Sequence, residues 1–148
     1  MKKEYLDQSI YYGCVDANTK REGLGVYMYK TGDIYFGNWK ENTLTNGTYL
    51  FKNGESFEGV VKNGKQGQGV YRYSNGNIYD GFWKDDLKNG HGNMSYPSGA
   101  KYEGEWLKGK KHGQGIYYYE NGIQYRGGFA LGKKYGNGVF LFPNGTKV

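Results

Sequence analysis

Residues 102–115 read YEGEWLKGKKHGQG, and the order of aromatic residues and glycines in this stretch recurs along the chain. A Gly-x-Gly follows each opening motif except the second, where Thr45 replaces the first glycine. A fixed period of this length is typical of one small structural unit stacked along an axis. The opening motif, Tyr-x-Gly followed two residues later by an aromatic residue or valine, recurs every 22 to 24 residues, with one Phe for Tyr, at Tyr11, Tyr35, Phe57, Tyr79, Tyr102 and Tyr125.

The period also predicts the organisation of the chain. Residues 1–10 are expected to form an N-terminal edge strand or cap. A stack of this kind has a long surface and no single central core, so binding is the first functional hypothesis. Six repeats are expected at residues 11–34, 35–56, 57–78, 79–101, 102–124 and 125–148.

The segments between glycines have the pattern of β-strands. They are short, rich in Tyr, Phe, Trp and Val, and alternating. In the fourth repeat, Tyr79, Gly81 and Trp83 share one face of a strand, while Asp80 and Phe82 share the other. The repeats therefore build one face of aromatic residues and glycines. A glycine in a strand leaves a gap that a neighbouring ring can cover, so a sheet without a second layer can bury ring area against its own backbone.

Glycine-containing turns connect the repeats. The pairs Asn53-Gly54, Asn75-Gly76, Asn121-Gly122 and Asn144-Gly145 predict hairpin turns, because both residues tolerate positive φ. The turns within repeats are expected to be longer and basic. Together these features predict an all-β fold: an elongated, twisted, single-layer antiparallel meander of about a dozen strands, built from 23-residue hairpin repeats, with one concave face.

Composition limits the compartment and the class of protein. The net charge is +6, the pI is near 9.2, and 18% of the residues are aromatic. No apolar run approaches the roughly 18 residues that a membrane-spanning helix needs, and the first residues lack the apolar stretch of a signal peptide. The single Cys14 cannot form an internal disulfide. These features predict an intracellular, cytoplasmic protein.

The sequence offers no catalytic, metal or cofactor site. His91 and His112 are the only histidines, and zinc needs three or four ligands. No Gly-x-Gly-x-x-Gly motif is present, so a dinucleotide or phosphate loop is not expected. Near-identical repeats provide no unique pocket, so we expect no enzyme. Nucleic acid is not an expected partner, because only three arginines occur and the aromatic rings are needed by the fold.

The motifs resemble the MORN (membrane occupation and recognition nexus) repeat, and residues 102–115 carry the resemblance best. Its pattern runs Tyr-x-Gly-x-Trp, a basic turn with glycine, His-Gly-x-Gly, an aromatic strand and a glycine turn. The chain departs from it at Val15 and Val61, which replace tryptophan, and at Thr45. The resemblance implies a curved single-layer sheet and a scaffold function, as in ciliary (axonemal radial-spoke), cytoskeletal and membrane-associated assemblies.

The concave aromatic face is the first candidate site. We expect most of its tyrosines to be structural, and a second set of rings to reach a partner. Large apolar patches and exposed aromatic residues are typical of interaction sites. The hypothesis is therefore a non-catalytic scaffold or adaptor that docks a helical or extended protein segment there. The rings expected to contact the partner are Tyr73, Trp83, Tyr96, Trp106, Tyr117, Tyr119 and Phe140.

The basic turns are the alternative site. Their lysines are expected along one edge of the sheet, where they could tether the protein to an anionic membrane. The simpler interpretation is a soluble edge that resists aggregation. An unpaired strand at either end of the sheet would also allow a homodimer. The candidate lipid-contacting lysines are Lys84, Lys88, Lys108, Lys110, Lys111, Lys133 and Lys134.

Overall fold

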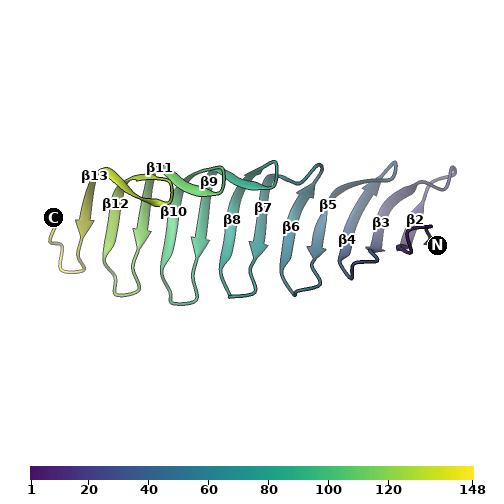
Figure 1. The fold of residues 1–148 in the computed structure, drawn as a ribbon, viewed down its shortest axis with the longest axis horizontal. Helices are drawn as coiled ribbons and strands as arrows, with labels where there is room; N and C mark the ends of the chain where they lie inside the picture. The colour runs from purple at the N-terminus through teal and green to yellow at the C-terminus, as the bar shows by residue number, and fades with distance from the viewer.

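The computed structural model describes residues 1–148 as one open sheet of 13 antiparallel strands, with no helix (Figure 1). Every strand hydrogen-bonds to the strands that precede and follow it in the sequence, and the two termini lie at opposite ends of the long axis. The predicted all-β meander is confirmed. The strands are β1 (Lys2–Glu4), β2 (Ile10–Val15), β3 (Arg21–Met28), β4 (Ile34–Lys40), β5 (Thr43–Leu50), β6 (Ser56–Val61), β7 (Lys65–Arg72), β8 (Ile78–Lys84), β9 (Leu87–Ser95), β10 (Lys101–Leu107), β11 (Lys110–Tyr118), β12 (Gln124–Ala130) and β13 (Lys133–Leu141).

The two edges of the sheet differ. The short strand β1 pairs with β2 and forms one edge. At the other edge, the chain after β13 turns back, so that Phe140 and Val148 exchange two backbone hydrogen bonds of 2.8 and 2.9 Å. Part of the β13 edge is therefore already paired, which leaves fewer backbone groups for a strand from another chain.

A ring lying over glycines forms the basic packing unit. In the fourth repeat, the Tyr79 ring lies over Gly92, which faces Gly81 across the β8–β9 pair. A Cβ atom on Gly92 would meet Tyr79 Oη at 2.2 Å, so the ring occupies the space that a side chain would fill. The Tyr79 hydroxyl donates a hydrogen bond to the carbonyl oxygen of Phe82 at 2.9 Å. Glycine is required at this close approach, as the repeat pattern predicts.

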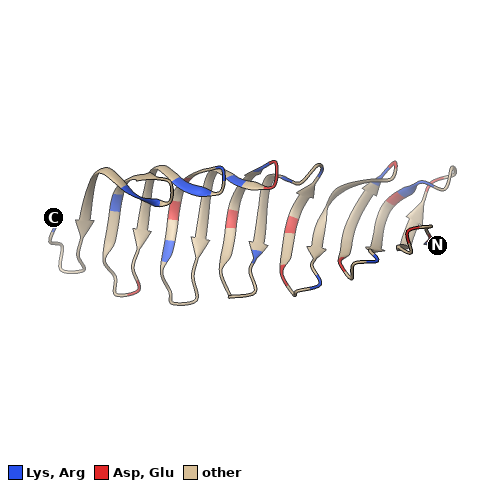
Figure 2. Cartoon of the chain, viewed as in Figure 1, with Lys and Arg blue, Asp and Glu red and all other residues tan.

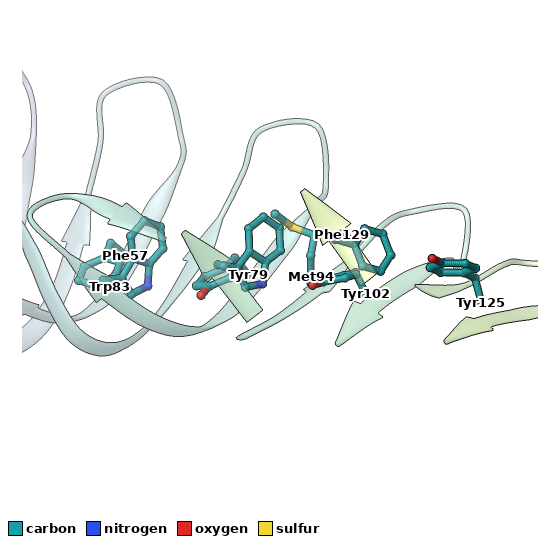
Figure 3. Packing of buried hydrophobic residues seen from close by; sticks show 8 residues of the cluster. Phe57, Tyr79, Trp83, Met94, Tyr102, Tyr125 and Phe129 are labelled. Carbon is teal, nitrogen blue, oxygen red and sulfur yellow. The ribbon is translucent and has the colours of Figure 1, made fainter. Parts of the chain in front are cut away.

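These units join into two clusters of buried side chains on the same face of the sheet. Figure 3 shows most of the larger cluster, which runs from Phe57 to Tyr125. Neighbouring rings meet edge to face: the Tyr79 and Trp106 centroids are 5.3 Å apart at 89°. The larger cluster contains Phe57, Tyr79, Trp83, Met94, Tyr102, Trp106, Tyr125 and Phe129, and the smaller contains Tyr11, Tyr27, Tyr35 and Trp39.

The turns between repeats differ from the predicted type. Each loop has three residues, and only its glycine takes a positive φ, near 90° in Gly54, Gly76 and Gly122. The preceding Asn instead accepts a hydrogen bond through its side chain, as in the 2.9 Å bond from the Asn77 N–H to Asn75 Oδ1. The predicted hairpin turns are present, but the Asn does not take a positive φ, because its side chain closes the turn without a left-handed backbone.

The turns within repeats are tighter than predicted. Four of them have two residues, both at positive φ, as in Asp85 (47°) and Asp86 (72°). Two such residues match the right-handed twist of the paired strands. Beside each turn the strand pairing shifts, and a glycine such as Gly113 takes a φ of 61°. This bulge bends the sheet, and in Figure 1 these turns curl over at the upper edge.

Tyr35 departs from the packing unit. Its ring is fully buried, yet its hydroxyl has no hydrogen-bond partner. In this repeat Thr45 replaces a glycine. The strand pairing shifts directly between the adjacent residues Asn38 and Trp39, whereas in the other repeats one residue of the corresponding strand lies unpaired at the shift. The acceptor in other repeats is the carbonyl oxygen three residues after the tyrosine, and here that oxygen, on Asn38, accepts a hydrogen bond from Thr45 Oγ1 at 3.1 Å instead.

The difference between Tyr35 and Tyr79 predicts opposite effects of the same substitution. Tyr35→Phe will leave the free energy of unfolding unchanged or raise it, because it removes a buried hydroxyl that has no partner. Tyr79→Phe will lower it by about 0.5–1.5 kcal/mol, because the hydrogen bond to Phe82 is lost. Denaturant unfolding of both variants beside the wild type measures these changes. A Tyr35→Phe protein less stable than Tyr79→Phe would contradict the explanation.

Leu131 provides a test of the turn geometry. It is an exposed leucine with a φ of 51°, a region that costs a non-glycine residue about 1–2 kcal/mol and that Asn tolerates better. Leu131→Asn will therefore raise the free energy of unfolding by about 0.5–1 kcal/mol. Leu107→Asn is the control, because Leu107 is also exposed but has no positive φ. Equal effects of the two substitutions on thermal unfolding would rule out the backbone explanation.

Candidate binding face

The aromatic face has two levels of ring. We call the buried side chains of the two clusters the floor. A second set, the rim rings, is half-buried and packs against the larger cluster. The Tyr117 and Tyr119 centroids are 4.8 Å apart, and those of Tyr96 and Tyr117 are 6.2 Å apart. The rim rings include Tyr73, Tyr96, Tyr117, Tyr119 and Phe140, which the sequence places among the partner-contacting residues.

Two of the predicted contact residues lie in the floor. Trp83 and Trp106 are each only 6% exposed. Their indole N–H groups donate hydrogen bonds of 3.1 Å to the carbonyl oxygens of Gly69 and Gly92 on neighbouring strands. The expectation that these tryptophans are accessible is therefore wrong. Alternation assigns them to the correct face, but it does not reveal that neighbouring rings cover them.

Further rings extend the rim toward the N-terminal repeats. Tyr29 and Tyr49 stack with centroids 5.7 Å apart, and Phe51 lies 4.6 Å from Tyr49. Phe51 in turn lies 5.8 Å from Tyr71. These residues are absent from the predicted contact set, although the same four-residue offset from the second glycine marks Tyr29 and Phe51 in the sequence.

Three of the candidate lipid-contacting lysines lie over the aromatic face. Lys88 Nζ is 5.0 Å from the Trp106 ring centroid and 3.2 Å from Tyr73 Oη. Lys111 Nζ is 5.1 Å from the Tyr117 centroid, and Lys134 Nζ is 5.3 Å from that of Tyr119. The prediction that all the lysines line one exposed edge is wrong for these three, because their strands curl and bring the ammonium groups above the rings, where cations are attracted.

In two other repeats the same position also holds a cation, which the sequence prediction does not place on this face. Arg21 lies 4.5 Å from the Trp39 centroid, and Lys65 Nζ lies 5.1 Å from that of Trp83. All these cations stand two residues before the first glycine of a Gly-x-Gly, so strand alternation would have placed them on the aromatic face. The other predicted lysines, Lys84, Lys108, Lys110 and Lys133, are exposed, and Lys134 is exposed as well. Figure 2 shows that several Lys and Arg positions lie along the upper edge of the sheet, where the turns within repeats are.

Burial changes the proton affinity of this face. It raises the pKa of Tyr73 and Tyr96, because the charged phenolate would lose its hydration. It lowers the pKa of Lys88, with a further contribution from the positive charge of Lys111. A hollow of about 420 Å³ lies beside these groups, and Lys65, Tyr73, Trp83 and Lys88 are among its lining residues. The face therefore combines apolar rings with partly desolvated positive charge.

The histidine, cysteine and carboxylate side chains do not gather into a metal-binding group. No group of three or more His, Cys, Asp or Glu side chains is arranged to hold a metal ion. His91 and His112 are both exposed. The chain also has no helix that is long and apolar enough to cross a membrane.

Comparison with known families agrees with the geometry. The sequence model of the MORN repeat matches residues 17–34, 57–78, 79–101, 102–124 and 125–147. The chain belongs to the MORN repeat family. No MORN match covers residues 35–56, where Thr45 replaces a glycine and Leu44 takes the place of the cation over the rings. This segment still forms β4 and β5. No curated protein sequence gives a significant match to the chain.

Solved structures resemble this MORN sheet in fold. The Drosophila melanogaster SAS-4 (dCPAP) TCP domain, in complex with a proline-rich motif of Ana2 (dSTIL), has 13% sequence identity and a TM-score of 0.62, with 99% of this chain and 80% of that chain covered. The wild-type TCP10 domain of Danio rerio CPAP has 10% identity and a TM-score of 0.31, with 99% and 81% covered. At this identity, the first of these shows a shared fold.

The buried tyrosines of the MORN floor predict a loss of stability at high pH. Burial raises the pKa of Tyr35 from 10.0 to about 12. A pKa that is higher in the folded than in the unfolded state contributes stability that is complete below pH 10 and is lost as the pH rises toward 12. The thermal midpoint will therefore fall across this range, and tyrosinate absorbance will follow unfolding. Complete ionisation of the tyrosines near pH 10 with an intact circular dichroism spectrum would contradict this prediction.

Proposed function

We propose that this protein is a non-catalytic scaffold that docks a segment of a partner protein on the aromatic face. The observation that carries the proposal is the set of half-exposed rim rings on a fixed floor, with no second layer of the fold covering them. Aromatic side chains held in one conformation provide large contact area at low cost in conformational entropy. The site occupies the third to sixth repeats, and the rings at Tyr29, Tyr49 and Phe51 extend it.

Two comparisons support this choice. The chain belongs to the MORN repeat family, and the family resemblance implies a scaffold. A solved domain of similar fold is in complex with a proline-rich motif of another protein. A peptide segment is therefore a suitable occupant for an open sheet of this kind. The proposed setting, a cytoskeletal, ciliary or membrane-associated assembly, comes from the family resemblance.

Contact with an anionic membrane is the competing proposal. It rests on the exposed residues Lys84, Lys108, Lys110 and Lys133, and on the net charge of +6. Lys88, Lys111 and Lys134 lie over the rings instead. A membrane that contacts only the turn edge would therefore not contact all three ammonium groups. A membrane contact through the turn edge would also leave the half-exposed rim rings without a partner.

The scaffold proposal is tested by selecting phage-displayed random peptides on the immobilised full chain. The double variant Tyr96→Ala/Tyr119→Ala removes two rim rings and leaves the floor in place. It will weaken the selected peptides at least about tenfold, as expected for the loss of aromatic anchors. Fluorescence anisotropy measures the affinities, and circular dichroism checks that the variants fold.

The matched control is Phe36→Ala/Phe82→Ala, which removes two exposed rings from the opposite face of the sheet. This variant will bind the peptides as tightly as the wild type. Failure to select any peptide would overturn the proposal, and so would equal binding by the rim variant and the wild type.

A further inference from the structure

A row of cations follows the aromatic face, with one position in each repeat. Arg21 occupies the position in β3, Lys65 in β7, Lys88 in β9, Lys111 in β11 and Lys134 in β13. Each cation lies within 6 Å of the centroids of several rings. In the second repeat the position is apolar, because Leu44 pairs with Trp39 there.

For every cation of the row except Lys134, which lies in the sixth repeat, the turn of the next repeat lies beside the cation and determines whether it has a partner. The backbone N–H of Asp86 donates to the Lys65 carbonyl oxygen at 3.1 Å, and the Asp86 carboxylate forms an ion pair with Lys65 Nζ at 2.5 Å. Asn42 takes the same place beside Arg21, where its carbonyl oxygen accepts a hydrogen bond of 2.9 Å from the guanidinium. Lys65 is therefore neutralised within the chain, whereas Arg21 has neutral hydrogen-bond acceptors and no carboxylate partner.

The later cations have no such partner. Gly109 donates its N–H to the Lys88 carbonyl oxygen at 2.8 Å, and Gly132 does so to Lys111 at 3.1 Å, in the place that Asp86 occupies beside Lys65. Neither glycine has a side chain to offer. No carboxylate lies within ion-pair distance of Lys88, Lys111 or Lys134. Three neighbouring repeats thus present unpaired ammonium groups above apolar rings.

The unpaired state has an energetic consequence. Burial lowers the pKa of Lys88 and of Lys111, because each ammonium has lost hydration and has gained no anion in return. The nearest cation of the row adds repulsion to both. A carboxylate placed between the rings would relieve these effects, since charge-assisted hydrogen bonds are strong where water is partly excluded.

We propose that the aromatic face recognises an acidic peptide segment, whose carboxylates pair with Lys88, Lys111 and Lys134 while its apolar side chains pack on the rim rings. This inference rests on the proposed scaffold function and names the chemistry of the partner. Charge complementarity is the argument for this occupant: three adjacent unpaired cations line a face that otherwise offers rings.

The spacing of the cations defines a sequence signature. Successive lysines lie two strands apart, which is about 9.6 Å. A polyproline II segment spans about 9.3 Å in three residues, which is one full turn, and a helix spans about 10.5 Å in seven. Acidic residues in the bound segment are therefore expected every third residue if it adopts polyproline II, or every seventh if it is helical.

The chain itself provides the variants for a test. Gly109→Asp/Gly132→Asp gives Lys88 and Lys111 an internal carboxylate, in the turn position where Asp86 already pairs with Lys65. Gly109→Asn/Gly132→Asn is the matched control, because the side chain has the same shape but no charge. Asn42 and Asp86 show that both residue types adopt the required positive φ, and a Cβ atom at either glycine meets no atom closer than 3.8 Å.

The experiment uses the phage-displayed random peptides selected on the full chain. We expect the peptides to be enriched in Asp and Glu, and the Asp variant to bind them at least about tenfold more weakly than the Asn variant, which is the change expected for loss of a charge-assisted contact. Synthetic copies with Gln and Asn in place of Glu and Asp will bind both variants equally weakly.

The outcomes separate this inference from the scaffold function. Peptides that depend on the rim rings but bind the Asp and Asn variants equally would overturn the acidic partner and leave the scaffold intact. If no peptide depends on the rim rings, both proposals fail. Binding to phosphatidylserine vesicles, weakened by the Asp variant, with no peptide selected, would assign the cation row to a membrane surface and also overturn both.

Discussion

The contact between an aromatic ring and a glycine backbone is the constraint on which the rest of this structure depends. A single-layer sheet has no second layer to cover its apolar face, so the rings must bury themselves against their own strands. The Tyr79 ring does this only because Gly92 lacks a side chain, and the tyrosine hydroxyl then reaches a backbone carbonyl of the same repeat. The 23-residue period follows, because each ring needs a glycine pair at a fixed distance along two strands.

This packing makes one face of the sheet both the core and the surface. The floor rings are as buried as the centre of a globular protein, while the rim rings one step along the same strands remain half-exposed. A ring such as Trp106 thus contributes to stability by hydrogen bonding to Gly92, and it also fixes the position of the Lys88 ammonium above it. Stability depends on the floor rings, and the proposed recognition would use the adjacent rim rings, which can be altered without removing the floor.

The sequence predicts the fold well, because its strongest signals are local. The glycine spacing gives the strands, alternation gives the face of Tyr79 and Trp83, and both are confirmed. The errors arise where geometry depends on neighbours. Asn75 closes its turn with its side chain, which the dipeptide alone does not reveal. The burial of Trp83 depends on rings from adjacent strands. Sequence reasoning does not identify the cation row, because Lys88 and Lys111 lie next to predicted turns and are interpreted as turn residues. Their spacing from the next glycine nevertheless places them on the aromatic face.

The differences between repeats carry the proposed specificity for an acidic segment, while their similarity carries the fold. The third repeat and the fifth share the same ring–glycine packing, yet Asp86 neutralises Lys65 while glycine leaves Lys111 without a partner. A repeat scaffold can therefore keep one architecture and vary the charge of a single turn position, since that residue is exposed and carries none of the ring–glycine packing. As a result, Lys65 has an ion-pair partner while Lys88, Lys111 and Lys134 have none, so the two ends of the otherwise periodic face differ in free positive charge. A bound segment with its acidic residues at one end would then have a preferred orientation along the sheet.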